Sequence, residues 1–251
     1  MKQKKKHIRF IPEVKDFVEQ GIRDDLSPEQ IAGIAKIEGK SCVSHERIYQ
    51  HIWKDKKNGG DLCKHLRTQG KRYRNRGNKK DRRGCIPNRI DIEQRPSIVQ
   101  KKTRFGDLEI DTVIGKNHQE SLVTINDRKT GIVFIKKVDS KTADLVTKAA
   151  IDAISPWKDL MHTITADNGK EFALHQKIAQ ELNIDFYFAK PYQSWQRGAN
   201  ENTNGLIRQY FPKKTNFAEI TVEQVKWVQQ KINNRPRKRV NFLTPYKCLI
   251  K

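Results

Sequence analysis

The order of strand and helix signals after residue 105 constrains the fold of this chain more than any other feature of the sequence. Apolar runs typical of strands lie in GDLEIDTVIG, in both halves of SLVTINDRKTGIVFIKKV, in MHTITADNG and in IDFYFAK. Helices are predicted in KTADLVTKAAIDAI, KEFALHQKIAQELN and QSWQRGANENTNGLIRQYF. The predicted elements therefore follow the order β-β-β-α-β-α-β-α.

This order predicts an α/β fold with a mixed sheet. The first three strands can form an antiparallel meander, and the later strands can join it in parallel through right-handed helical crossovers. An RNase H-like sheet requires that arrangement, so we expect an RNase H-like catalytic core over residues 101–251. One more amphipathic helix is expected in TVEQVKWVQQKINNRPRKRV, with a cationic end and with one apolar side formed by Val222, Val225, Val228 and Ile232.

Residues 1–55 predict a small all-α domain of three short helices. Ser27, Pro28 and Gln30 have the pattern of a capping box with proline at the first helical position. After Ser44, a third helix is expected to turn Ile48, Tyr49 and Ile52 inward and His45, Arg47 and Gln50 outward. Such a domain is either a helix-turn-helix that binds DNA through residues such as His45 and Arg47, or a plain three-helix bundle with a solvated face.

The charge balance favours the DNA-binding alternative. Lys and Arg number 51 against 29 Asp and Glu, a formal net charge of +22, which indicates a polyanionic partner. Residues 64–83 hold ten Lys or Arg and one acid, with almost no apolar side chains. We therefore predict a basic linker over residues 56–100 that lies along DNA phosphates through Lys71, Arg72 and Arg74. A solvated segment without ordered contacts is the alternative.

Cellular location is predicted from what the sequence lacks. No stretch approaches the roughly 20 apolar residues of a membrane-spanning helix, and the cationic start has no apolar signal-peptide region. The four cysteines, Cys42, Cys63, Cys85 and Cys248, form no C-x-x-C pair, so free thiols are expected rather than a zinc site or disulfides. These features predict a cytoplasmic protein with no membrane partner.

Three carboxylates occupy positions that suit a catalytic site. Asp111 lies in the first strand, Asp167 ends the fourth, and Glu201 lies in the helix after the fifth, where Asn204 and Arg208 share its face at helical spacing. Taken singly, each carboxylate is better explained without catalysis: Asp167 by turn chemistry, Glu201 as a surface acid and Asp111 as part of a polar network. Taken together, they suit two Mg²⁺ or Mn²⁺ ions about 4 Å apart for in-line phosphoryl transfer. Glu109 shares the strand face of Asp111 and leaves the choice of first ligand open.

Several stretches resemble a DDE transposase of the retroviral-integrase-like superfamily, most closely the bacterial insertion sequence thirty type. They are GDLEIDTVIGK, TADNGKEF and YQSWQRGANENTNGLIRQYFPK, with 33 residues between Asp167 and Glu201, together with SPEQIAG, SHERIYQHIW, RGCIPNRIDIEQRP and NNRPRKRVNFLTP. The resemblance implies that Asp111, Asp167 and Glu201 are the metal-binding catalytic triad. It also makes Arg208 the basic residue that follows the triad, and leaves Glu109 a supporting role.

The resemblance further implies cleavage at the terminal inverted repeats of a mobile element and strand joining by a 3′-hydroxyl, on double-stranded DNA and in a homo-oligomer. Lys190 and Asn204 are expected to contact DNA beside Arg208. Members of this family carry a further helix-turn-helix ahead of the matched part, and this sequence starts at MKQKKKHIRF without it. A DNA-binding regulator or inactive truncated remnant, and a ribonuclease H, therefore stay as alternative predictions.

Overall fold

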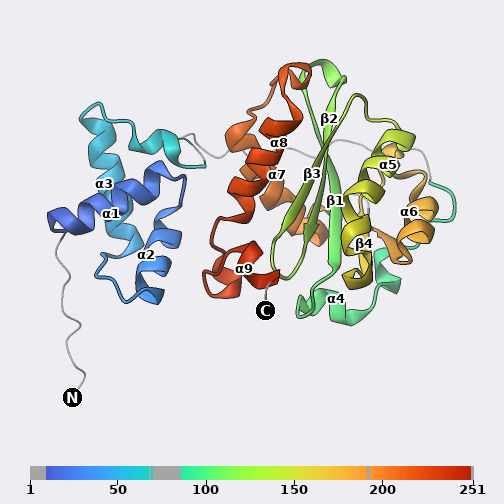
Figure 1. Cartoon of the computed structure of the whole chain (residues 1–251), viewed down its shortest axis with the longest axis horizontal. Coiled ribbons are helices and arrows are strands. Elements are labelled where there is room, and N and C mark those ends of the chain that lie inside the picture. Colours follow the sequence, from blue (N-terminus) through green and yellow to red (C-terminus); the bar gives the residue numbers. More distant parts are fainter. Residues whose placement is uncertain (1–9, 68, 70–85, 191–192, 250–251) are drawn as a thin grey trace. The chain divides into compact units, whose positions relative to one another are not determined.

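The computed structural model describes residues 10–67, 69, 86–190 and 193–249. The chain divides into two compact units, and each has its own core (Figure 1). The helical unit comprises Met1–Arg76 and Arg235–Thr244, and the sheet unit comprises Gly77–Asn234 and Pro245–Lys251.

The three predicted N-terminal helices are present as α1 (Pro12–Arg23), α2 (Pro28–Ile37) and α3 (His45–Lys57), followed by the 3-10 turn η1 (Leu62–His65). The capping box of α2 is formed: Gln30 donates its backbone N–H to Ser27 Oγ at 3.3 Å, and Ser27 N–H donates to Gln30 Oε1 at 2.8 Å. Ile48 and Ile52 of α3 are fully buried as expected. Tyr49 is 38% exposed, which corrects its predicted inward position.

The short segment Arg235–Thr244 joins the helical unit, although the sequence assigns it to the catalytic domain. Gln30 donates a side-chain hydrogen bond to the carbonyl of Pro236 at 2.7 Å. Phe242 packs against Gly33 so closely that a Cβ at Gly33 would lie 2.4 Å from the ring. The contact between Phe242 and α2 therefore requires a glycine at position 33, and local sequence patterns do not reveal this contact.

The described part of the predicted linker also packs into the two units. Leu62, Cys63 and Leu66 belong to the core of the helical unit, and Ile92 and Val99 are buried in the sheet unit. These apolar side chains are too widely spaced in a basic stretch to predict a core by periodicity. Residues 70–85, which carry most of the charge run, lie outside the described residues.

The predicted mixed sheet is confirmed. Its strands are β1 (Asp107–Ile114), β2 (Ser121–Asp127), β3 (Val133–Val138), β4 (Thr163–Ala166) and β5 (Asp185–Phe188), in the order β3-β2-β1-β4-β5. The pairs β1–β2 and β2–β3 are antiparallel, and β1–β4 and β4–β5 are parallel. This is the meander with parallel additions expected of the RNase H-like fold.

Helices cover both faces of the sheet (Figure 1). Helices α5 (Ala143–Ile154) and α6 (His175–Leu182) pack on one face, and α7 (Gly198–Tyr210) and α8 (Val222–Asn233) pack on the other. Val222, in the first turn of α8, is 52% exposed, so it does not share the buried side predicted for it. The remaining described elements are short: η2 (Ile92–Gln94), α4 (Ser97–Lys101), η3 (Lys116–His118), η4 (Ser155–Leu160), η5 (Lys170–Phe172), η6 (Ser194–Arg197), η7 (Phe217–Glu219), η8 (Lys238–Val240) and α9 (Pro245–Leu249).

Successive side chains of β1 point to opposite faces of the sheet. Leu108 and Ile110 point into the core shared with α5, whereas Val113 belongs to the core shared with α7 and α8. Glu109 and Asp111 are therefore on the face that α7 covers. Among the described residues, no helix is long and apolar enough to span a membrane.

The free edge of β3 is closed by α8. Asn233, 1% exposed, accepts the backbone N–H of Val133 and donates to its carbonyl, both at 2.8 Å. Gln229 accepts the N–H of Ile135 at 2.7 Å. These side chains replace the hydrogen bonds of a sixth strand and block edge-to-edge association.

We expect Asn233→Leu to lower the free energy of unfolding of the sheet unit in urea by about 1–3 kcal/mol for each backbone group left unpaired. Asn234→Leu is the matched control, because Asn234 is exposed, and it should change stability by no more than about 0.5 kcal/mol. Equal effects of the two substitutions would show that the edge contacts contribute nothing.

Candidate active site

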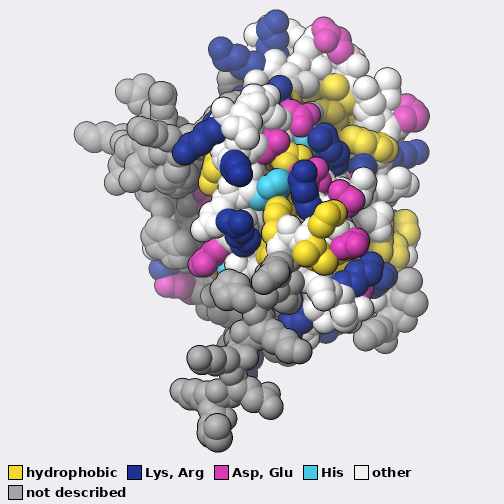
Figure 2. Space-filling model, turned by 90° about the vertical axis from the view of Figure 1, so that its left-hand side faces the viewer, with side chains coloured by type: hydrophobic (Ala, Val, Ile, Leu, Met, Phe, Trp, Pro, Cys, Tyr) yellow, Lys and Arg dark blue, Asp and Glu magenta, His cyan; other side chains and the backbone are white. Residues whose placement is uncertain are grey.

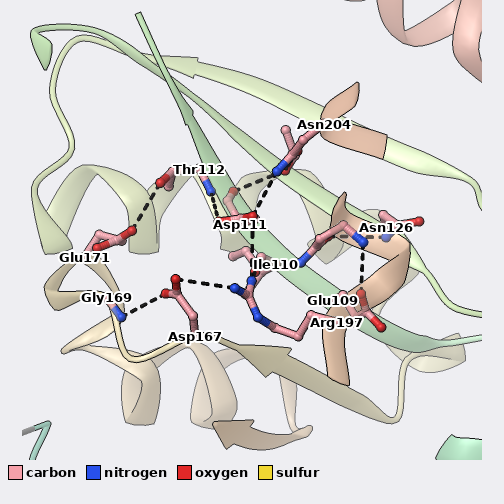
Figure 3. A network of polar contacts seen from close by, with 12 residues as sticks. Glu109, Ile110, Asp111, Thr112, Asn126, Asp167, Gly169, Glu171, Arg197 and Asn204 are labelled. Atoms are coloured by element: carbon pink, nitrogen blue, oxygen red, sulfur yellow. Dashed lines mark hydrogen bonds and ion pairs between the residues drawn. The ribbon is translucent and has the colours of Figure 1, made fainter. Parts of the chain in front are cut away.

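The sheet brings Asp111 and Asp167 together. Parallel pairing aligns Glu109 with Thr165, so Asp111 on β1 and Asp167, just past the end of β4, come level with one another. Arg197 lies between them: its Nη1 is 3.6 Å from Asp111 Oδ2, and its Nη2 is 3.4 Å from Asp167 Oδ2 (Figure 3). One guanidinium thus faces one oxygen of each carboxylate.

Both carboxylates are oriented by further hydrogen bonds. Asp111 Oδ1 accepts the N–H of Thr112 at 2.9 Å, and Asp167 Oδ1 accepts the N–H of Gly169 at 2.8 Å. Asn204 on α7 donates to Asp111 Oδ2 at 2.8 Å. The Oδ1 atoms are therefore fixed by the backbone, while the Oδ2 atoms converge on the space that holds the guanidinium (Figure 3).

The electrostatic balance at Asp111 is mixed. Burial raises the pKa of Asp111, and the neighbouring charge of Asp167 raises that pKa further. Arg197 and the hydrogen bonds from Thr112 and Asn204 oppose the rise. Two neighbouring carboxylates repel each other, and a cation close to both relieves that repulsion.

Glu201, the third predicted ligand, is not with the other two. It lies in the first turn of α7 and is exposed. Among the described residues, no three His, Cys, Asp or Glu side chains lie close enough together to hold a metal ion. The positive charge between Asp111 and Asp167 is instead provided by Arg197, one turn before Glu201.

Glu109 fixes the start of α7. It is 1% exposed and forms an ion pair with Arg128, which is 2% exposed, and its Oε2 accepts the N–H of Asn200 at 3.0 Å. The N–H groups of a first helical turn have no partner within the helix, and a carboxylate there is favourable. Glu109 therefore supports the helix that carries Glu201.

The predicted DNA contacts are found in several settings. Asn204 contacts Asp111, and Lys190 forms an ion pair with Glu93. Arg208 donates to the carbonyl of Ile114 at 2.7 Å and, more weakly, to carbonyls at the end of α7. In the sheet unit these side chains hold the structure together, so their contacts with phosphate stay predictions.

The DNA contacts expected of the other unit remain predictions too. His45 and Arg47 are exposed in the first turn of α3, and Arg47 Nη1 donates to Gln50 Oε1 at 3.0 Å. Lys71, Arg72 and Arg74 lie outside the described residues. On the face drawn in Figure 2, Lys and Arg side chains are interspersed with acidic ones rather than gathered in one patch.

Two residues of this site could not be singled out from the sequence. Arg197 belongs to a polar stretch, and its position immediately before α7 gives no local signal that it reaches two strands. Glu171 is 6% exposed, receives a hydrogen bond from Thr112 Oγ1 at 3.1 Å and pairs with Lys141 at 2.7 Å. Its place in TADNGKEF, four residues after Asp167, is the available signal.

Removing Arg128 should destabilise the sheet unit, because it leaves Glu109 as a buried charge without its partner. We expect Arg128→Met to lower the free energy of unfolding by about 3–5 kcal/mol. Lys129→Met, at the exposed neighbouring position, should stay within about 0.5 kcal/mol of the parent. The double variant Glu109→Gln, Arg128→Met should recover part of the loss, and no recovery would contradict the buried-charge explanation.

The sequence has informative relatives, although no protein-family model matches it. It is 55% identical over 246 residues to the transposase for insertion sequence element IS4351 of Bacteroides fragilis, covering 97% of this chain and 76% of that protein. It is 35% identical over 232 residues to transposase InsI for insertion sequence element IS30A of Escherichia coli K12, covering 87% of this chain and 60% of the relative. The transposase for insertion sequence element IS1086 of Cupriavidus metallidurans is 33% identical, with 82% and 62% covered.

Two solved structures overlap with this chain at 18% identity. A chain of the simian T-cell lymphotropic virus intasome gives a TM-score of 0.48 over 68% of this chain and 59% of that chain. The catalytic core domain of BIV integrase gives 0.44 over 57% and 93%. The first of the sequence relatives is matched over about three quarters of its length, so the chain belongs to the transposases of bacterial insertion sequence elements.

Proposed function

We propose that this protein catalyses metal-dependent DNA strand cleavage and strand transfer at the ends of an insertion element, with Asp111, Asp167 and Glu201 as its catalytic carboxylates. The convergence of one oxygen of Asp111 and one of Asp167 on a single cationic group carries the proposal. Relatives named as transposases of insertion elements give the reaction class.

The donor set fits a hard divalent cation. Asp111 and Asp167 come from neighbouring strands, each with one oxygen fixed by a backbone N–H and the other facing a positive charge. Carboxylate oxygens and water are the ligands that Mg²⁺ and Mn²⁺ prefer. Glu201 is the third ligand in this proposal, and it reaches the other two when α7 or its first turn moves.

A pair of bound Mg²⁺ or Mn²⁺ ions would activate a water or a 3′-hydroxyl and stabilise the leaving 3′-oxygen. The protein's own part is positional. Glu109 and Arg128 hold the start of α7, Asn204 holds Asp111, and the Glu171–Lys141 pair supports Thr112. Together they keep the carboxylates aligned for in-line attack.

The helical unit is proposed to bind the DNA of the element ends or the target. Three helices with a capped third helix fit a helix-turn-helix, and His45 and Arg47 are exposed at the start of that helix, where base edges are read. The chain has 51 Lys and Arg against 29 Asp and Glu, and this surplus of positive charge supplies affinity for phosphates. The proposal includes homo-oligomerisation to hold two ends, and work in the bacterial cytoplasm at the nucleoid.

The test is a strand-cleavage and strand-transfer assay on the element's terminal inverted repeats with Mg²⁺ or Mn²⁺. Asp167→Asn and Glu201→Gln should each reduce both activities by at least about a hundredfold, because each removes a group that stabilises transition-state charge. Their DNA affinity in a mobility-shift assay should stay close to that of the parent.

Glu181→Gln is the matched control, since Glu181 is an exposed acid on α6, away from the carboxylates. It should leave cleavage unchanged. A parent protein that binds the authentic ends but never cuts them would instead identify a DNA-binding regulator or an inactive remnant. Full activity of Glu201→Gln would remove Glu201 from the triad.

A further inference from the structure

Three carboxylates at alternate positions of β1 point to the side of the sheet that α7 covers, and each one faces an arginine. Asp107, which is 0% exposed, receives two hydrogen bonds of 2.9 Å from Arg104. Glu109 is paired with Arg128 in the buried contact described above. In each of these two pairs the arginine hydrogen-bonds directly to its carboxylate, as expected of ion pairs that stabilise a fold.

The third pair has a different geometry. Arg197 stands 3.6 Å from Asp111 and 3.4 Å from Asp167, whereas charge-assisted hydrogen bonds typically measure about 2.7–2.9 Å. Its Nε is buried without a hydrogen-bond partner. Its Nη1 also donates a long hydrogen bond of 3.4 Å to the carbonyl of Ile110. Arg197 is thus shared between two acids and held loosely by both.

We propose that Arg197 is a built-in counterion that occupies the place of a divalent cation between Asp111 and Asp167, so that its ion pairs and metal binding exclude one another. This inference rests on the proposed function, because it takes Asp111 and Asp167 as metal ligands. The same two Oδ2 atoms serve both cations, and a guanidinium at this position would repel a divalent ion placed beside it.

The position of Arg197 in the chain links this exchange to the third carboxylate. Arg197 ends η6 and immediately precedes α7, and Glu201 lies one helical turn further on. When the guanidinium leaves, the start of α7 loses its tie to Asp111 and to the end of β4. The first turn of α7 keeps its hydrogen bond to Glu109, Glu201 turns toward the metal about that anchor, and Arg197 is released toward a DNA phosphate, which its planar donors match.

The test measures Mn²⁺ binding to the full chain by isothermal titration calorimetry and by electron paramagnetic resonance. Arg197→Gln should bind Mn²⁺ about tenfold more tightly than the parent, the change expected when a competitor worth about 1.4 kcal/mol is removed. Arg208→Gln is the matched control: it removes the same charge at the other end of α7, and its guanidinium contacts carbonyls rather than these carboxylates. Its Mn²⁺ affinity should rise by far less.

Asp167→Asn separates the two proposals. If the parent and Arg197→Gln bind Mn²⁺ equally, and both lose that binding with Asp167→Asn, the competition is overturned while the metal site stands. If neither protein shows binding that depends on Asp167, the proposed function and this inference both fail. If Arg208→Gln gains as much as Arg197→Gln, the effect is one of net charge and the inference is overturned.

A second measurement needs no substitution of Arg197 that could impair folding. In the parent protein, the Nε–H resonance of Arg197 should move on addition of diamagnetic Mg²⁺ and become narrower as the side chain leaves the site. The corresponding resonance of Arg208 should not move. An Arg197 signal unaffected by saturating Mg²⁺ would overturn the exchange.

Discussion

The burial of negative charge on one face of β1 is the constraint on which the sheet unit depends. Asp107, Glu109 and Asp111 alternate along the strand, so they all point to the same face, and that face is covered by protein rather than by water. A buried carboxylate is costly unless it is paired and hydrogen-bonded. Arg104, Arg128 and Arg197 meet this requirement from three different parts of the chain.

The three ion pairs have different roles: those at Asp107 and Glu109 stabilise the fold, and the one at Asp111 lies at the proposed metal site. The pairs at Asp107 and Glu109 lie deep in the unit, and the second of them anchors the first turn of α7 through Asn200. The pair at Asp111 lies near the carboxyl end of β4, and ligands bind at such strand ends in open α/β sheets. The same electrostatic requirement therefore produces a rigid base and, at its end, an exchangeable cation position.

The three proposed catalytic carboxylates are held by two different kinds of element, the sheet and a helix. The sheet fixes Asp111 and Asp167 through backbone register, which cannot vary without moving a whole strand. Glu201 instead lies on a helix whose first turn is held by side chains from β1. Asp111 and Asp167 are thus assembled by the sheet in this structure, while Glu201 is exposed on its helix.

The helical unit illustrates a second consequence of long-range packing. Its three helices follow from local signals, above all the capping box at Ser27 and Gln30. The segment that contains Phe242 completes the unit from a distant part of the chain, because Gly33 leaves room for the ring. The sequence predicts that Tyr49 faces inward beside Ile48. Successive residues on a helix point in different directions, however, and the packing of α3 leaves Tyr49 exposed.

The sequence by itself determined the order of elements, the placement of Asp111 in β1 and of Asp167 at the end of β4, and the helix caps at Ser27 and Ser44, because these depend on periodicity and on contacts within a few residues. Its resemblance to a family supplied the prediction that Asp111, Asp167 and Glu201 are the catalytic carboxylates. Only the tertiary structure decided that Arg197 lies between two of them, that Glu109 holds α7, and that Arg235–Thr244 belongs with the helical unit. Those outcomes depend on which distant side chains meet once the sheet has formed, and no local pattern encodes such a meeting.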